Sequence, residues 1–152
     1  LMEIERKYLI DKNKIPFQPS DFPCRRIEQG YLCTEPVVRV RRDQDDYILT
    51  YKSKGLMARE EYNLPLTKEA YLHLREKTDG RLITKDRYVI PLSCDSPLLI
   101  ELDFFRGDLD GLILAEVEFP DLLSAETFHA PDWFGEDVTH SSRFHNSNLS
   151  KL

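Results

Sequence analysis

Six pairs of like-charged side chains, each pair separated by one residue, are the feature of this sequence with the clearest chemical meaning. They are Glu3/Glu5, Arg39/Arg41, Lys52/Lys54, Lys85/Arg87, Glu101/Asp103 and Glu116/Glu118. Successive side chains on a β-strand point to opposite faces, so the two members of each pair share a face. The residue between them is often apolar, as are Val40, Leu102 and Val117.

One such pair on an antiparallel strand is most simply part of a solvated face. Six pairs, segregated into all-acidic and all-basic groups, favour a binding site. Crowded cations repel one another unless an anion lies between them. Crowded carboxylates favour a divalent cation, and oxygen ligands of this kind suit Mg2+ or Mn2+. A cavity that holds both groups would suit a polyphosphate, because the cations and the metal would stabilise charge on its phosphoryl oxygens.

Alternating patterns predict a mainly antiparallel β protein of the α+β class with few helices. A flat sheet would leave the charges in solvent, and a closed barrel would place them either outside or inside as a polar tunnel. Residues 11–26 are expected to be irregular or a short helix, Pro131, Trp133 and Phe134 an apolar turn, and 139–149 a helix or lid. The expected strands are 2–10, 27–33, 37–41, 47–54, 59–66, 82–92, 97–105 and 112–119, with helices at 67–77 and 121–128.

The composition predicts one domain spanning residues 1–152. A net charge of −6 argues against a general nucleic-acid or anionic-membrane binder. No apolar run has the length of a membrane span, and no signal peptide is expected before Met2. Cys24, Cys33 and Cys94 lack close spacing, which predicts reduced thiols and a cytoplasmic location.

Motifs for other chemistries are absent from the sequence. It contains neither a G-x-x-x-x-G-K-[ST] loop nor a G-x-G-x-x-G turn. His73 and His129 are interpreted as surface residues. His140 and His145 lie in the tail, where a place at a tunnel mouth is the alternative to the simpler surface position. Spacing supports no Ser-His-Asp or Cys-His arrangement.

The charged pairs occur in an ordered series that resembles the CYTH superfamily of triphosphate tunnel metalloenzymes. Glu3-Ile4-Glu5-Arg6-Lys7 matches its N-terminal E-x-E-x-K signature, and the likeness to the short bacterial branch covers nearly the whole chain. The supporting stretches are Gln29–Leu32, Arg39–Arg41, Leu49–Gly55, Arg59–Tyr62, Gly80–Arg81 with Lys85 and Arg87–Tyr88, Ile100–Asp103, Ala115–Phe119 and Trp133–Thr139.

This resemblance implies an eight-stranded closed tunnel barrel and the activity of an inorganic tripolyphosphatase, with some action on nucleoside triphosphates. By the same likeness, phosphates would be held by Lys7, Arg39, Arg41, Lys52, Lys54, Lys85, Arg87 and Arg143. Metal ligands would be Glu3, Glu5, Asp103, Glu116 and Glu118, while Glu61 and Glu101 would belong to the acidic lining, Glu61 toward the substrate and Glu101 as a catalytic candidate.

Three departures from the family pattern affect these expectations. Asn63 and Thr84 stand where acidic residues are usual, and the tail from His140 to His145 replaces an acidic, lysine-containing run. Loss of carboxylates could alter the metal preference. Loss of a tail lysine could change how the tunnel mouth is closed.

The leading hypothesis is metal-dependent hydrolysis of tripolyphosphate to diphosphate and phosphate, with Lys7 in the catalytic set. The water would be oriented by Glu5, Glu116 or Glu118, with Glu101 as a further candidate. Thiamine triphosphatase and class IV-type adenylate cyclase use the same residues and stay open, as does a non-catalytic polyphosphate-binding module. The outer apolar face of a barrel must be covered, either by the helices at 67–77 and 121–128 or by a second copy in a homodimer.

Overall fold

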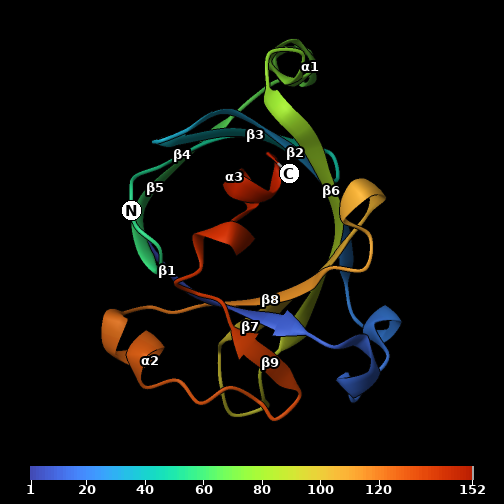
Figure 1. The fold of residues 1–152 in the computed structure, drawn as a ribbon, viewed down its shortest axis with the longest axis vertical. Helices are drawn as coiled ribbons and strands as arrows, with labels where there is room; N and C mark the ends of the chain where they lie inside the picture. The colour runs from blue at the N-terminus through green and yellow to red at the C-terminus, as the bar shows by residue number, and fades with distance from the viewer. Residues whose placement is uncertain (152) are drawn as a thin grey trace.

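Antiparallel β-strands make up nearly half of residues 1–151, the part of the chain that the computed structural model describes. The strand order is β5-β4-β3-β2-β6-β7-β8-β1, and β5 also pairs with β1, so these eight strands close into a barrel (Figure 1). A further strand, β9, pairs with β1. The strands are β1 (Met2–Ile10), β2 (Cys24–Thr34), β3 (Val37–Asp43), β4 (Asp46–Lys52), β5 (Ala58–Pro65), β6 (Asp79–Pro91), β7 (Leu99–Phe105), β8 (Ile113–Glu118) and β9 (Phe134–Asp137).

Three short α-helices accompany these strands in residues 1–151: α1 (Lys68–Arg75), α2 (Leu122–Glu126) and α3 (Asn146–Leu149). Thr67 caps α1 by accepting a hydrogen bond from the Ala70 amide at 3.1 Å, as its position before the helix predicts. On the outside of the barrel, α1 contacts β3 and β4. Tyr71 on α1 is fully buried, and its hydroxyl donates to Glu28 Oε1 at 2.7 Å.

The alternation along β1 separates an apolar outer face from a charged inner one. Ile4 and Tyr8 belong to a buried apolar cluster on the outside of the barrel. Partly buried side chains from the segments before β2 and after β8, such as Phe17 and Trp133, pack against this cluster. These segments remove the outer, apolar face of the strands from water. The inner face of the strands can therefore carry the charged side chains.

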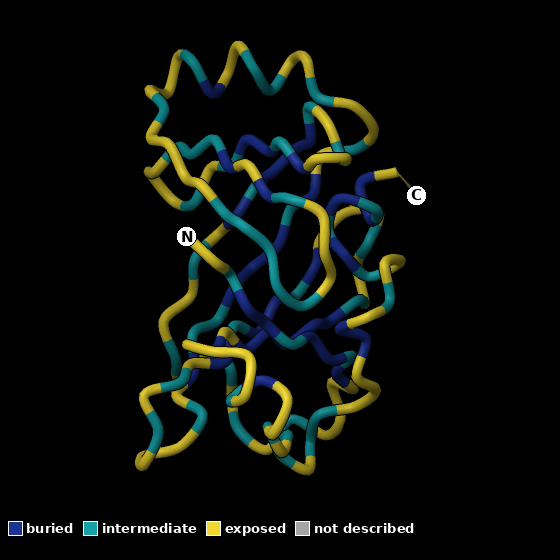
Figure 2. Tube along the Cα trace, turned by 90° about the vertical axis from the view of Figure 1, so that its left-hand side faces the viewer, coloured by how far each residue is buried: buried dark blue, intermediate teal, exposed yellow. Residues whose placement is uncertain are grey.

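The C-terminal segment, residues 139–150, lies inside one end of the barrel, where α3 is visible within the ring of strands (Figure 1). Leu149 is almost fully buried in a second apolar cluster that includes Tyr31, Ile83 and Leu114. The tube coloured by burial shows the same pattern, with buried chain through the centre and exposed chain in the outer turns (Figure 2). One end of the interior is therefore filled by this segment.

Gly80 allows the C-terminal segment to lie against β6. The Arg81 amide donates to the Ser150 carbonyl at 2.8 Å. Gly80 has a φ of +67°, and a Cβ there would approach the same Ser150 carbonyl oxygen to 2.3 Å. The glycine is thus required both by its backbone conformation and by the closeness of the tail.

The closed eight-stranded barrel confirms the fold expectation, including all eight predicted strands and both helices outside the tail. The apolar turn expected around Trp133 and Phe134 is wrong in one respect, because Phe134–Asp137 forms β9. The backbone of Tyr8 and Ile10 supplies the pairing partners of this strand, and Arg6 of β1 forms an ion pair with Asp137. A segment of four residues is too short to show an alternating pattern, so its pairing with a strand distant in sequence could not be predicted.

Two further observations bear on the expectations from composition. Cys24, Cys33 and Cys94 are exposed free thiols. Across residues 1–151, no helix combines the length and the apolar character needed to cross a membrane.

Candidate active site

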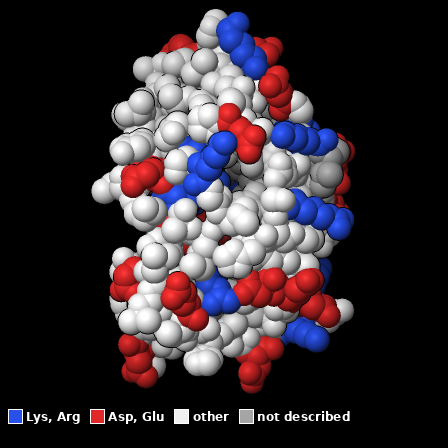
Figure 3. Space-filling model, turned by 60° about the vertical axis from the view of Figure 1, so that its left-hand side comes forward, with Lys and Arg blue, Asp and Glu red and all other residues white. Residues whose placement is uncertain are grey.

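A cavity of about 300 Å³ lies inside the barrel, and each of the eight barrel strands contributes to its wall. The chain's charge is unevenly spread, and in one space-filling view Lys and Arg side chains gather around a hollow at mid-height (Figure 3). The lining residues are Glu3, Glu5, Lys7, Arg25, Tyr31, Val37, Arg39, Arg41, Ile48, Thr50, Lys52, Arg59, Glu61, Asn63, Arg87, Glu101, Glu116, Glu118, His145, Asn146 and Ser147.

Carboxylates concentrate where β1 lies beside β8. Glu5 is directly opposite Glu118 in the antiparallel register, and Lys7 is opposite Glu116. Burial, together with the nearby charges of Glu116 and Glu3, raises the pKa of Glu5 to about 8. Burial and neighbouring carboxylates also raise the pKa of Glu118. Two facing acids without a counter-charge between them are destabilising, so this part of the cavity favours a cation.

The opposite wall carries arginines whose partners are neutral. Arg41 Nε donates to Gln29 Oε1 at 2.8 Å, and Arg39 Nη2 donates to Thr50 Oγ1 at 3.3 Å. The Nε atom of Arg39 is buried without a hydrogen-bond partner within the described residues. Burial and the charges of Arg39 and Arg87 lower the pKa of Arg41 to about 9. Neither guanidinium group forms an ion pair with a carboxylate of residues 1–151, which is a condition that favours binding of an anion.

A hydrogen-bonded chain joins β1, β4 and β5 at the edge of this basic wall. Lys52 Nζ donates to Glu3 Oε1 at 2.8 Å and lies 3.4 Å from Glu61 Oε2. The Asn63 amide donates to Glu61 Oε1 at 3.1 Å, and Thr50 Oγ1 donates to Asn63 Oδ1 at 2.6 Å. Against the effect of burial, these contacts with Glu3, Lys52 and Asn63 lower the pKa of Glu61 to about 2. Glu61 is therefore ionised, and this series of hydrogen bonds holds the side chains that take part in it in fixed positions.

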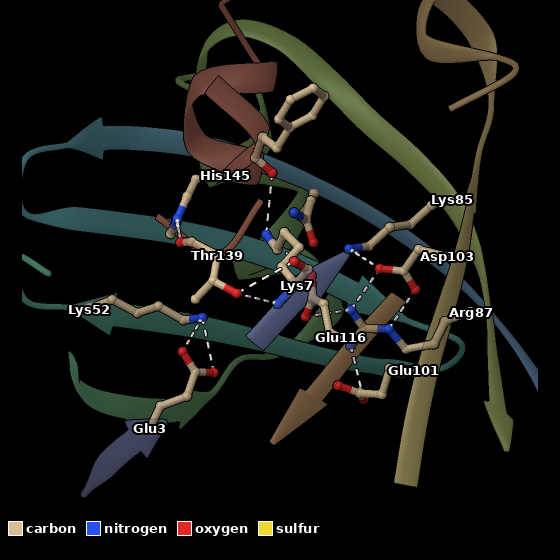
Figure 4. Close-up of polar contacts among 12 residues, drawn as sticks. Glu3, Lys7, Lys52, Lys85, Arg87, Glu101, Asp103, Glu116, Thr139 and His145 are labelled. Atoms are coloured by element: carbon tan, nitrogen blue, oxygen red, sulfur yellow. Dashed lines mark hydrogen bonds and ion pairs between the residues drawn. The ribbon is translucent and has the colours of Figure 1, made fainter. Parts of the chain in front are cut away.

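Lys7 projects into the interior close to Glu116, Arg87 and the tail (Figure 4). Its Nζ lies 3.4 Å from Glu116 Oε1 and donates to the Phe144 carbonyl at 3.3 Å. Although burial opposes the charged form, the carboxylates of Glu116 and Glu5 raise the pKa of Lys7. Arg87 Nη2 lies 3.7 Å from Glu116 Oε2, and Arg87 Nη1 donates to Glu101 Oε2 at 3.1 Å.

Asp103 and Lys85 lie behind the cavity wall, which corrects the expectation that they contact a metal and a phosphate. Both side chains are fully buried and are not part of the lining. Lys85 Nζ lies 2.8 Å from Asp103 Oδ2. Arg87 binds the same carboxylate through Nε at 2.8 Å and Nη2 at 2.9 Å (Figure 4). Both Asp103 oxygens are occupied, so this carboxylate positions Arg87.

Lys54 and Arg143, both expected at the tunnel, are exposed and do not line the cavity. β4 ends at Lys52, so the alternation that predicted an inward Lys54 does not continue to that residue. Arg143 lies in a 3₁₀ helix, Ser142–Phe144, with its guanidinium 5.3 Å from the centre of the Phe144 ring. The remaining predicted residues do line the cavity: Glu3, Glu5, Lys7, Arg39, Arg41, Lys52, Glu61, Arg87, Glu101, Glu116 and Glu118.

Three residues of the cavity with basic side chains were not among the predicted site residues. Arg25 falls in a segment expected to be irregular, but β2 begins at Cys24 and directs Arg25 inward. Arg59 lies opposite Glu3, with Nη2 4.0 Å from Glu3 Oε1, and the alternation with Glu61 would have found it. His145, interpreted as a surface residue, is 5% exposed and lines the cavity. Burial and the charges of Lys7 and Arg59 lower its pKa to about 4.

The carboxylates present fit a divalent cation that prefers oxygen ligands. Within residues 1–151, no group of three or more His, Cys, Asp or Glu side chains is already assembled as a metal site. Within those residues neither Glu5 nor Glu118, which face each other, forms an ion pair, and Glu3 is two residues from Glu5 on the same face. Hard oxygen donors of this kind suit Mg2+ or Mn2+.

Comparison with protein families supplies the deciding observation, because the CYTH domain matches residues 1–152. The chain belongs to the CYTH family. An inorganic triphosphatase of Nitrosomonas europaea is 36% identical over 153 residues, covering 99% of this chain and 97% of the relative. An inorganic triphosphatase of Acetivibrio thermocellus is 35% identical over 154 residues, covering 98% and 93%.

Two solved structures are similar to this one. The crystal structure of an inorganic triphosphatase, 35% identical, covers 99% of this chain and 95% of its own, with a TM-score of 0.71. A putative adenylyl cyclase from Hippeastrum with triphosphatase activity is 14% identical and covers 82% of both chains, with a TM-score of 0.58. The second likeness concerns the fold alone.

Proposed function

We propose that this CYTH protein hydrolyses inorganic triphosphate to diphosphate and phosphate inside the barrel, with a divalent cation. One observation carries the proposal: an enclosed cavity has arginines with neutral partners on one wall and facing carboxylates on another. A linear triphosphate carries negative charge along its whole length and has no apolar part, which matches a charged interior. Two inorganic triphosphatases of similar length, 36% and 35% identical, support the same substrate.

Substrate binding would fall to the cations that line the cavity. Arg39 and Arg41 would hold phosphoryl oxygens through bidentate hydrogen bonds, because each already has its orientation fixed by a neutral partner. Lys52 and Lys7 would add point charges from β4 and β1. Arg87 would contribute from β6, held in place by Asp103. Positioning by groups fixed before binding lowers the reorganisation needed during the reaction.

Glu5 and Glu118, with Glu3, would hold Mg2+ or Mn2+, which would neutralise negative charge developing on the phosphoryl oxygens. Hydrolysis adds water to the terminal phosphorus and breaks the bond from that phosphorus to its bridging oxygen, which leaves with diphosphate. Glu116 and Glu101 are engaged by Lys7 and Arg87. Glu5 is free of such ion pairs among residues 1–151, and we assign it to orient the water.

A substrate panel tests this function directly. Purified protein would be assayed with tripolyphosphate, ATP and thiamine triphosphate, each with Mg2+, Mn2+ or EDTA. Separation of phosphate, cyclic AMP and thiamine diphosphate as products distinguishes the triphosphatase from the cyclase and from the thiamine triphosphatase. We expect metal-dependent release of phosphate from tripolyphosphate. Retention of tripolyphosphate without turnover under all metal conditions would identify a binding module instead.

Arg41→Ala and Arg42→Ala form a matched pair for the panel. The two residues are neighbours on β3, but Arg41 lines the cavity while Arg42 is exposed on the outer side. We expect Arg41→Ala to lower kcat/KM by roughly 100-fold, the effect of losing a preorganised electrostatic contact. Arg42→Ala should retain the wild-type value. Equal losses in both variants would contradict the assigned substrate wall.

The thiamine triphosphatase alternative loses its structural support in this fold. Trp133 and Phe134 are in edge-to-face contact, with ring centres 4.7 Å apart, and both pack against the outer apolar cluster. Phe144 packs against the cluster around Leu149. Packing against the two apolar clusters therefore accounts for these partly buried rings, and no contact among residues 1–151 points to a surface for the rings of thiamine.

We further propose a cytoplasmic location and a homodimer. Exposed free thiols at Cys24, Cys33 and Cys94 fit a reducing compartment.

The homodimer is proposed from an exposed apolar area on β5. Tyr62 and Leu64 on the outer face of β5 are more than half exposed, so this part of the barrel exterior is left for a second copy to cover. Light scattering on the purified protein tests the dimer, and a mass of one chain at all concentrations would contradict it.

A further inference from the structure

Lys54, which does not reach the main cavity, lies in a second pocket of about 270 Å³. This pocket is beside the C-terminal segment, and its wall comes from the β2–β3 turn, the β4–β5 connection and the tail. Segments that are distant in sequence thus form the wall of one pocket. Its lining residues are Thr34, Glu35, Pro36, Val37, Ser53, Lys54, Gly55, Leu56, Arg59, Ser142, His145, Ser147, Asn148 and Lys151.

The charge of this second pocket is predominantly positive. Lys54, Arg59 and Lys151 contribute cations, and among residues 1–151 Glu35 is the only carboxylate side chain in the lining. Within residues 1–151, neither lysine forms an ion pair, and the contact of Arg59 with Glu3 is long, at 4.0 Å. Three cations facing one space with a single acid favour occupation by an anion.

The second pocket is also lined by residues with neutral hydrogen-bond donors. Thr34, Ser142 and Ser147, which carry hydroxyl groups, line it together with the cations. Ser147 and His145 are 9% and 5% exposed, so the tail side of the pocket is a packed wall. A small volume, three cations and several hydroxyl-bearing residues favour a compact inorganic oxyanion over a larger organic ligand.

The two cavities share a wall made of Val37, Arg59, His145 and Ser147. Arg59 is the one cation of this set, so its guanidinium lies between the triphosphate cavity and the second pocket. We propose that the second pocket is a separate binding site for an inorganic phosphate anion, orthophosphate or diphosphate. Orthophosphate and diphosphate are also the products expected from the function proposed above. Only their interpretation as products depends on that function; the binding of a phosphate anion does not.

Titration of 15N-labelled, metal-free protein with sodium orthophosphate tests the site, followed by the amide signals of Gly55 and Thr50. Gly55 lines only the second pocket and Thr50 lines only the main cavity. We expect two separate binding curves in the wild type. The double variant Lys54→Ala/Lys151→Ala should weaken binding seen at Gly55 by about tenfold or more, since charge-assisted contacts are lost, and leave the Thr50 curve unchanged.

Two further variants serve as controls. Arg41→Ala should affect the Thr50 curve alone, and Lys68→Ala removes an exposed lysine of α1 and should change neither curve. The proposal is overturned if the Gly55 signal does not shift in the wild type, if the double variant keeps wild-type affinity there, or if Lys68→Ala weakens it equally. Repeating the titration with diphosphate compares the two anions. Failure of the triphosphatase panel would leave this result standing, because the titration requires no turnover.

Discussion

Glu5 and Glu118 lie directly opposite each other in the pairing of β1 with β8, and both line the interior of the barrel. Like charges in this position destabilise an antiparallel pair. Bound Mg2+ or Mn2+ would relieve the repulsion, so we expect either metal to raise the melting temperature. At a metal concentration of about 100 times Kd, the stabilisation would be about 2.7 kcal/mol.

Glu5→Gln and Glu118→Gln should each remove most of this metal-induced stabilisation, as measured by calorimetry with and without EDTA. Glu60→Gln is the control, because Glu60 lies on β5 and does not line the cavity. A full metal response in Glu5→Gln would show that the cation binds elsewhere.

The pH dependence of the metal-free protein provides an independent check on Glu5. Its pKa is about 8 in the folded protein against an ordinary value of 4.5, so the folded state binds one more proton between these values. The contribution of Glu5 to the free energy of unfolding is therefore fully present below pH 4.5. It falls as the pH rises from 4.5 toward 8, by up to about 1.4 kcal/mol per pH unit. Urea denaturation across this range should show a smaller fall in Glu5→Gln than in the wild type. Parallel profiles would contradict the role of Glu5.

Asp103 is the shared partner of two buried cations, Lys85 and Arg87. Asp103→Asn would leave their charges without the carboxylate, and we expect a loss of about 3–5 kcal/mol in the free energy of unfolding. The affinity for metal should be retained, because Asp103 does not line the cavity. The combination Asp103→Leu/Lys85→Met removes both charges and should recover part of the stability. A stable Asp103→Asn protein that no longer binds metal would restore Asp103 as a ligand.

Alternation along single strands was enough to predict the barrel and much of its interior. Glu3, Glu5 and Lys7 share the inner face of β1, as their spacing indicates, while Ile4 and Tyr8 are buried outside. The same rule fails for Lys54, since the strand ends at Lys52. Alternation also does not predict how deeply an inward side chain is buried. Lys85 and Asp103 both point inward, but they form an ion pair with each other behind the cavity wall.

The tail was the part of the site that the sequence could not resolve. Residues 139–150 have no regular pattern, and their position depends on contacts with strands far away in sequence, such as the bond from the Arg81 amide to the Ser150 carbonyl. His145 is directed inward by this docking, which favours the tunnel position over the surface position that the sequence left as the simpler alternative. The same docking creates the second pocket from three segments that no local motif connects.

Asn63 keeps the two hydrogen-bonded side chains next to Arg39, those of Thr50 and Asn63, neutral. It accepts from Thr50 Oγ1 at 2.6 Å, and Thr50 in turn accepts from Arg39 Nη2 at 3.3 Å. Asn63→Asp would place a carboxylate beside this arginine and would remove the amide that donates to Glu61. We expect KM for tripolyphosphate to rise about tenfold with a much smaller change in kcat, since the added charge competes with the anion for Arg39.

Steady-state kinetics with Asn63→Asp, Asn63→Ser and the wild type test this role. Asn63→Ser is neutral and should stay closer to the wild type than Asn63→Asp, although it shortens the side chain. Because charge is the proposed cause, the KM difference between the Asp and Ser variants should shrink as the ionic strength rises. Equal KM values in these two variants would mean that the shape of the side chain at position 63, and not its charge, controls binding.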